Sequence, residues 1–187
     1  MESGQLLAVF AGKPQTITID GRETSTAIYK LPVTGPVMVR TLNIDGDQQG
    51  DLTVHGGVDK AVYCYPVEHY DTWSAELKRA LDRGTFGENL TVSGFLEDTM
   101  HIDDVIEMGT ATLQVSQPRY PCYKLGHKMG DQRFIKRFQQ SERSGFYCRV
   151  LQEGMIEAGD TMRVVVRDES LPTIADIVRS RNKRDAV

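Results

Sequence analysis

Short apolar segments separated by glycine and proline turns recur along most of this chain and limit the folds it can adopt. Leu6–Phe10 is the first such segment, and Asp20-Gly21 lies between the next two, Thr16–Ile19 and Thr26–Tyr29. An Asp-Gly pair supplies the positive φ angles of a tight hairpin turn. Further strand candidates are Val37–Leu42, Val105–Met108, Ala111–Ser116, Phe146–Leu151 and Thr161–Val166. The sequence therefore predicts a mainly β fold.

Helical periodicity is found in three places. In Pro66–Leu81, apolar residues recur every three or four positions, which predicts an amphipathic helix with Pro66 in its first turn and Gly84 at its exit. Trp73 lies in that apolar stripe, so we expect it in the core. Asp131–Phe138 predicts a second helix capped by Asp131, and Thr173 is placed to cap a last one from Ile174 onward. Two or three short helices at the edge of the β structure are expected.

Length and charge narrow the class of protein. The chain has 187 residues, enough for one domain with a proper core, and its formal net charge is −4. A duplex-binding protein usually carries a basic face, so we do not expect a nucleic acid duplex as a partner. The one basic cluster, Arg179 to Arg184, is interpreted as a helix end or a solvated tail.

The cellular location is predicted from the absence of a membrane-spanning run and of an export signal in the sequence. No apolar run is long enough to cross a bilayer, and the first residues have no export signal. A cytoplasmic protein without membrane association is the expectation, whereas its oligomeric state stays open.

The three cysteines are well separated, at positions 64, 122 and 148. An odd number without CxxC pairs argues against both a disulfide framework and a zinc finger. Cys64 and Cys148 are interpreted as reduced, buried thiols. Cys122 differs, because it follows Pro121 with Arg119 and Lys124 close by in the sequence. Nearby cations stabilise a thiolate, the form that ligates metals or attacks electrophiles, as would a helix turn opening at Cys122.

Two other segments combine glycine with polar residues. In His55–Lys60, the adjacent Gly56 and Gly57 could present backbone N–H groups to an anion beside the Lys60 ammonium. In Phe86–Leu90, Asn89 offers donors and an acceptor that suit the edge of a heterocycle. Taken alone, either segment is better interpreted as an ordinary turn.

Together the three segments resemble the MOSC family, named for the C-terminal domain of molybdenum cofactor sulfurase, and in particular its bacterial YiiM-like branch. The resemblance rests on HGGVDKAVYCYPVEHYDTW, FGENLTVSG and LQVSQPRYPCYKLGHKMG, and it extends from about residue 1 to residue 167. It implies a MOSC-type β-barrel over residues 1–170. Residues 171–187 would then be a C-terminal helix or tail, a truncated remnant of the three-helix domain that follows in YiiM relatives.

The resemblance also implies a function. Such proteins bind the molybdenum cofactor, a molybdopterin, with one protein cysteine as metal ligand; Cys122 occupies that place. The other cofactor-binding residues implied are His55, Gly56, Gly57, Lys60, Asn89, Arg119 and Lys124, with His55 also the candidate acid. The implied reaction is reduction of N-hydroxylated bases such as 6-hydroxylaminopurine, with electrons from a separate flavoprotein reductase.

Two other functions stay open at this point. Cys122 could carry a persulfide in a sulfur carrier, a role that a low-pKa cysteine suits equally well. The chain could also be a non-catalytic module that stores or delivers the cofactor. Pyridoxal phosphate has less support, because no acidic partner for a pyridine nitrogen accompanies Lys60.

Overall fold

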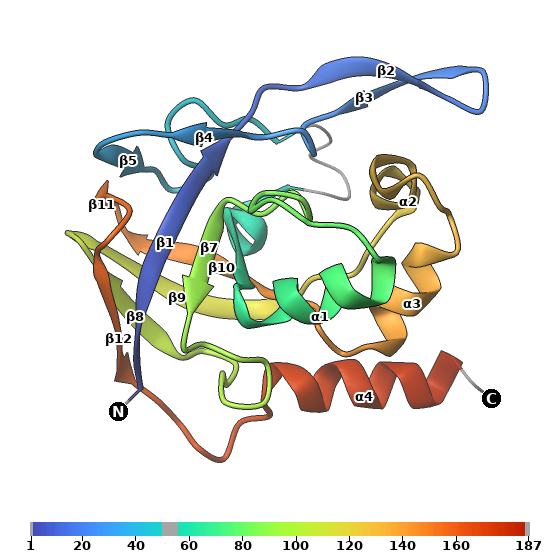
Figure 1. Ribbon diagram of the computed structural model, residues 1–187. Coiled ribbons are helices and arrows are strands. Elements are labelled where there is room, and N and C mark those ends of the chain that lie inside the picture. Colours follow the sequence, from blue (N-terminus) through green and yellow to red (C-terminus); the bar gives the residue numbers. More distant parts are fainter. Residues whose placement is uncertain (1, 50–55, 186–187) are drawn as a thin grey trace.

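Seven strands close into a barrel in the order β12-β8-β9-β10-β6-β7-β1, because β1 also pairs with β12 (Figure 1). The computed structural model describes residues 2–49 and 56–185. The barrel strands are β1 (Ser3–Ala11), β6 (Val62–Pro66), β7 (Leu90–Ser93), β8 (Val105–Met108), β9 (Ala111–Pro118), β10 (Phe146–Gln152) and β12 (Thr161–Val166). Each pairing around the barrel is antiparallel except β6–β7, which is parallel. This confirms the predicted mainly β, barrel-type fold.

Smaller β elements decorate the barrel. They are β4 (Leu31–Val33), which extends the sheet beside β1, the pair β5 (Val37–Val39) and β11 (Gly154–Ile156), and the hairpin β2 (Gln15–Ile19) with β3 (Arg22–Thr26). Asp20 and Gly21 have φ angles of 50° and 77°, as the predicted turn requires. The second strand begins at Arg22, earlier than predicted, because a two-residue turn places Arg22 directly opposite Ile19. The strand predicted over Val37–Leu42 likewise ends at Val39.

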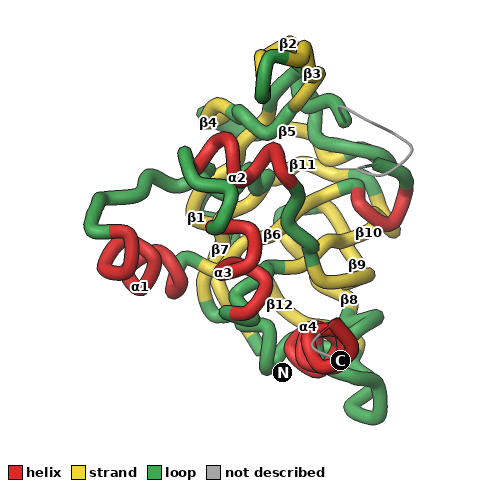
Figure 2. The backbone as a smooth tube through the Cα atoms, turned by 90° about the vertical axis from the view of Figure 1, so that its right-hand side faces the viewer, coloured by secondary structure: helices red, strands yellow, loops and turns green. Residues whose placement is uncertain are grey.

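The four α-helices of the described residues lie together on one side of the barrel (Figures 1 and 2). They are α1 (Glu68–Leu77), α2 (Tyr123–Met129), α3 (Phe134–Gln140) and α4 (Ile174–Asp185). The prediction of two or three helices was too low because α2 was not anticipated. The predicted bounds of α1 were also wrong: Pro66 closes β6, and the helix ends at Lys78, whose φ of 54° is left-handed. None of the helices among the described residues is long and apolar enough to span a membrane.

The hydrophobic core has two parts. The barrel interior is mainly aliphatic, with Leu6, Val62 and Leu113 fully buried. A second cluster beneath the helices is aromatic and contains Tyr63, Tyr65, Tyr70, Trp73, Phe86, Phe134 and Phe138. Trp73 is completely buried there, as expected, and donates from Nε1 to the Tyr65 hydroxyl at 2.8 Å. The aromatic cluster attaches α1 and α3 to the barrel.

Helix α4 packs against this domain instead of extending as a solvated tail. Ile174 belongs to the barrel core, and Thr173 caps the helix by accepting from the Asp176 N–H at 3.1 Å. Arg179 pairs with Glu142, and the Arg181 guanidinium lies 3.8 Å from the centre of the Tyr120 ring. The basic cluster is therefore the end of a helix. Its assignment to a remnant of a further domain stays a prediction.

Candidate functional site

One pocket brings together five of the predicted site residues: Lys60, Asn89, Arg119, Cys122 and Lys124. They come from the end of the 3-10 helix η1 (Val58–Lys60), the residue before β7, the loop after β9 and the start of α2. The pocket encloses about 670 Å³, counting the part open to solvent. Thr26, Ala27, Ile28, Lys30, Asp47, Gln48, Gln49, Ala61, Tyr63, Gly87 and Tyr147 complete the lining.

Cys122 is the residue immediately before α2 and has extended backbone angles, with φ −126°. Its side chain lines the pocket and is only partly buried, whereas Cys64 and Cys148 are buried in the barrel core. Burial raises the pKa of the Cys148 thiol, as expected of an inert cysteine. Of the three sulfurs, only that of Cys122 is in position to meet a ligand in this pocket.

Arg119 brings a buried cation to the pocket. It is 6% exposed, and its guanidinium lies 5.1 Å from the centre of the Tyr63 ring. Its Nη1 atom has no hydrogen-bond partner within the described part of the chain. Burial would lower the pKa of Arg119, but Tyr63, Tyr147 and Cys122 outweigh it and raise that pKa above its usual range. A buried donor without a partner is costly, so it marks a place where a ligand could bind.

Lys124 adds a second buried cation, at 9% exposure, and makes no hydrogen bond or ion pair with any residue for which the structure gives a position. Lys60 also lines the pocket. Lys30 is different, because Asp47 neutralises it in a buried ion pair. The pocket therefore has an excess of positive charge beside a thiol. That combination suits an anionic ligand that also contains a soft metal.

Asp47 supports this pocket from a loop that the sequence did not single out. Besides Lys30, its carboxylate accepts from the Gly12 N–H and from Asn89 Nδ2, both at 2.8 Å. Asn89 in turn accepts from the Tyr63 N–H at 3.1 Å, so its amide is already engaged with the protein. The geometry gives Asn89 the task of joining β6, β7 and Asp47, and its contact with a cofactor stays a prediction.

Gly56 and Gly57 are not among the residues that line the pocket. The Gly57 N–H donates to Gln49 Oε1 at 2.9 Å, and Gln49 Nε2 donates to the Lys60 carbonyl at 3.2 Å. Gly57 has a φ of 94°, a left-handed conformation that favours glycine, and its part in cofactor binding stays a prediction. Gln49, which sequence reasoning missed, organises this turn. His55 lies outside the described residues.

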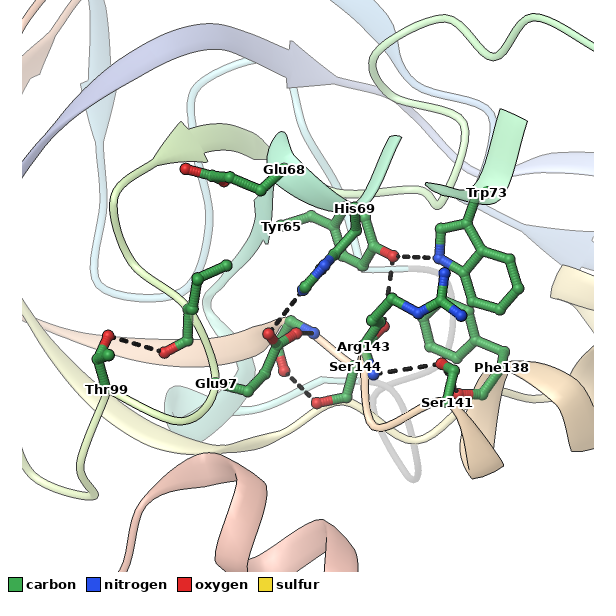
Figure 3. Close-up of polar contacts among 12 residues, drawn as sticks. Tyr65, Glu68, His69, Trp73, Glu97, Thr99, Phe138, Ser141, Arg143 and Ser144 are labelled. Carbon is green, nitrogen blue, oxygen red and sulfur yellow. Dashed lines mark hydrogen bonds and ion pairs between the residues drawn. The ribbon is translucent and has the colours of Figure 1, made fainter. Parts of the chain in front are cut away.

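A second group of polar residues comprises His69, Glu97, Arg143 and Ser144 (Figure 3), together with Gly145; we call it the back cluster. Glu97 is 4% exposed; it accepts from the Gly145 N–H at 2.6 Å and contacts His69 Nε2 at 2.7 Å.

The back cluster reaches the pocket through a short backbone segment. Tyr63, a pocket residue, donates its hydroxyl to the Ser144 carbonyl at 2.8 Å, and the Arg119 N–H donates to the Gly145 carbonyl at 3.4 Å. The segment Arg143–Gly145 therefore separates two polar regions, the pocket and the back cluster.

No cluster of three or more His, Cys, Asp or Glu side chains suited to a metal ion occurs in residues 2–49 and 56–185. A metal in this pocket would thus take few ligands from the described protein, with Cys122 in position to be one. A cofactor that brings its own sulfur ligands and a phosphate fits such a donor set, since the pocket offers one thiol and several cations.

Comparison with known proteins agrees with this geometry. The family model described as the MOSC domain matches residues 51–163. The uncharacterized protein YflK of Bacillus subtilis (strain 168) is 45% identical over 168 residues, covering 90% of this chain and 76% of that protein. A protein named "Reductase" from Gibberella moniliformis (strain M3125 / FGSC 7600) is 35% identical over 186 residues, covering 96% of this chain but 33% of that protein.

Among solved structures, YiiM from Geobacillus stearothermophilus superposes with a TM-score of 0.80 at 38% identity. The match covers 97% of this chain and 86% of that one. The barrel and its helices are thus shared with that protein.

Proposed function

Because the chain belongs to the MOSC domain family, we propose that it is an oxidoreductase that binds a molybdenum–pterin cofactor in this pocket and reduces N-hydroxylated bases and related compounds. Cys122 would be the protein ligand of the metal. The observation that carries the proposal is a partly exposed cysteine in the same pocket as two buried cations, Arg119 and Lys124, neither of which forms an ion pair with a carboxylate of the described residues.

The cationic residues fit the anionic parts of such a cofactor. Arg119 and Lys124 would bind its phosphate, because both are buried in the pocket wall. Lys60 would add charge from η1. An ionised phosphate strengthens each of these hydrogen bonds relative to a neutral acceptor. The protein thus contributes binding, orientation and electrostatics.

When bound, the cofactor supplies the two-electron redox chemistry that cleaves an N–O bond. In the overall reaction, R–NH–OH takes up two electrons and two protons and yields R–NH2 and water. We propose His55 as the source of a proton and a separate flavoprotein reductase as the source of electrons. The thiol of Cys122 must lose its proton to act as a ligand, and the neighbouring Arg119 guanidinium favours that ionised form.

The relative named as a reductase supports the general class of activity. Its aligned region includes nearly all of this chain, at 35% identity. This chain spans only a third of that protein, so the detailed substrate and electron donor rest on the proposal and not on the relative.

The test is metal and pterin analysis of protein purified from a host that makes the cofactor, combined with an assay on 6-hydroxylaminopurine and an artificial electron donor. We expect near-equimolar molybdenum and pterin, with turnover that Cys122→Ser abolishes and Cys148→Ala retains. Absence of molybdenum from active protein, or full activity in Cys122→Ser, would contradict the proposal.

A sulfur carrier is the second candidate, because the same accessible Cys122 in a cationic pocket suits a persulfide. It predicts protein without stoichiometric molybdenum and a Cys122 peptide heavier by one sulfur atom that thiols remove. A storage module would instead retain the cofactor and show no turnover with any N-hydroxylated substrate.

A further inference from the structure

Lys128, near the end of α2, connects three segments that are distant in the sequence. Its Nζ atom donates to the Ile28 carbonyl at 3.0 Å and to the Gly84 carbonyl at 2.8 Å. A lysine in the last turn of a helix usually lies in water beside the final carbonyls of its own helix. Here the helix that begins just after Cys122 is instead tied to two other parts of the chain.

Both of those parts belong to the wall of the pocket. Ile28 lines it directly, and Gly84 precedes the segment that contributes Gly87 and Asn89. The two parts also touch, because a Cβ placed on Gly87 would lie 2.7 Å from Ile28 Cγ1. Displacing Ile28 would therefore displace one side of the pocket relative to the other.

The Gly84 peptide is fixed from both sides. Its carbonyl accepts from Lys128, and its N–H donates to Glu88 Oε1 at 2.8 Å. Glu88 is fully buried and also accepts from the Tyr70 hydroxyl and from Thr91 Oγ1. The Lys128 contact thus connects α2 to a rigid part of the molecule.

Keeping the Lys128 ammonium charged in this position lowers the stability of the folded protein. It forms no ion pair with a carboxylate of the described residues. Its pKa is lowered to about 8, mainly by burial and to a smaller extent by the charges of Arg119 and Lys30, while Glu88 opposes the shift. A charge retained at a cost to stability, next to a candidate site, is typical of residues kept for function.

We propose that Lys128 is a positioning residue, which fixes the wall at residues 26–30 and the Gly84 turn against the Cys122 helix and so sets the width of the pocket. Its value to cofactor binding rests on the proposed function. Its effect on residues 26–30 and the Gly84 turn does not depend on the proposed function. Positioning and cofactor binding can therefore be tested separately.

The experiment is hydrogen exchange followed by mass spectrometry on cofactor-free protein, comparing wild type with Lys128→Met, Lys128→Arg and the control Lys136→Met. Lys136 is an exposed lysine on α3. We expect Lys128→Met to speed exchange of the amides of residues 26–30 and 84–87 about tenfold, because hydrogen bonds from a charged donor are lost. Exchange in β9 should stay at the wild-type rate. The unfolding temperature at pH 7 should not fall below that of wild type.

Lys128→Arg should restore most of the protection, since a guanidinium can also donate to two carbonyls. Unchanged exchange in Lys128→Met would overturn the proposal, as would faster exchange throughout the protein with a lower unfolding temperature. If the wall loosens as expected but no variant ever binds molybdenum, the proposed function fails and the positioning role stands.

Discussion

The regions on the two sides of the segment Arg143–Gly145, the pocket and the back cluster, differ in whether their buried arginine forms an ion pair. In the pocket, Lys124 and the Nη1 atom of Arg119 lack a protein partner among the residues described. In the back cluster, Glu97 contacts His69, and Arg143 forms an ion pair with Glu76 through Nη2 at 2.6 Å, although its Nη1 atom has no hydrogen-bond partner among the described residues. The Arg143 guanidinium also lies 4.0 Å from the centre of the Trp73 ring. Charges in ion pairs hold a scaffold together, whereas buried cations without an ion pair among the described residues indicate where an anionic ligand could bind.

This contrast predicts that removing a buried cation in or beside the pocket does not destabilise the protein at neutral pH, whereas substitutions in the back cluster do. The largest effect concerns Lys128, the buried cation beside the pocket. Its pKa of about 8 in the folded protein lies below the usual 10.5, so between these values the folded state binds fewer protons than the unfolded state. The stability of wild type relative to Lys128→Met should therefore rise between about pH 8 and pH 10, by on the order of 3 kcal/mol.

Urea unfolding of both proteins at several pH values checks this. The penalty for the charged amine is fully present below pH 8 and is relieved above it. Parallel pH profiles for the two proteins would show that Lys128 is not buried as a charge.

Arg119→Gln should weaken cofactor binding about 100-fold, because it removes a charged donor from the anion that the pocket would hold. Stability in urea should change little, since the lost group has an unsatisfied donor in the protein alone. A titration with the cofactor measures the affinity, and the exposed Arg133→Gln is the matched control. A large loss of stability with unchanged affinity would reverse the assignment of the two regions.

Glu97→Gln should lower the free energy of unfolding by about 2 kcal/mol, because it weakens buried contacts with His69 and Gly145. Cofactor affinity should stay within about twofold of wild type, on the additivity expected of separate sites. Glu107→Gln, at an exposed position on β8, controls for loss of a carboxylate. If Glu97→Gln reduced affinity as much as Arg119→Gln, the separation of the two regions would be lost.

Lys124→Met should have the smallest effect, about a tenfold loss of cofactor affinity with unchanged or higher stability, since an ammonium without an ion-pair partner in the described chain leaves a buried position. Cofactor titrations of wild type and Lys124→Met test the expected loss of affinity. Their urea unfolding midpoints test the expected stability. A destabilised Lys124→Met protein would place that lysine in the scaffold.

The sequence predicted best the features that depend on residues close together in the chain. Asp20-Gly21 predicted the hairpin from turn geometry alone, and Thr173 predicted the start of α4. The cations that flank Cys122 in the sequence led to Arg119, Cys122 and Lys124, which the structure brings together in one pocket.

Features that depend on distant partners were not predictable in this way. Asp47 reads as an ordinary loop residue, and only the fold brings Lys30, Gly12 and Asn89 to it. The end of α1 was missed because Lys78, a residue that seldom adopts left-handed angles, does so here. Such details are set by tertiary packing, which overrides local preference.

The pairing of β1 with β12 has a consequence for synthesis of the chain. Ser3 lies opposite Arg163, so the seam of the barrel joins residues from the beginning and the late part of the sequence. During translation, the edges of β1 and β8 that pair with β12 stay unpaired until β12 has left the ribosome. Exposed edges of this kind favour aggregation, and late, non-local closure slows folding. Nascent chains that stop before Thr161 should therefore need chaperone protection that longer ones do not.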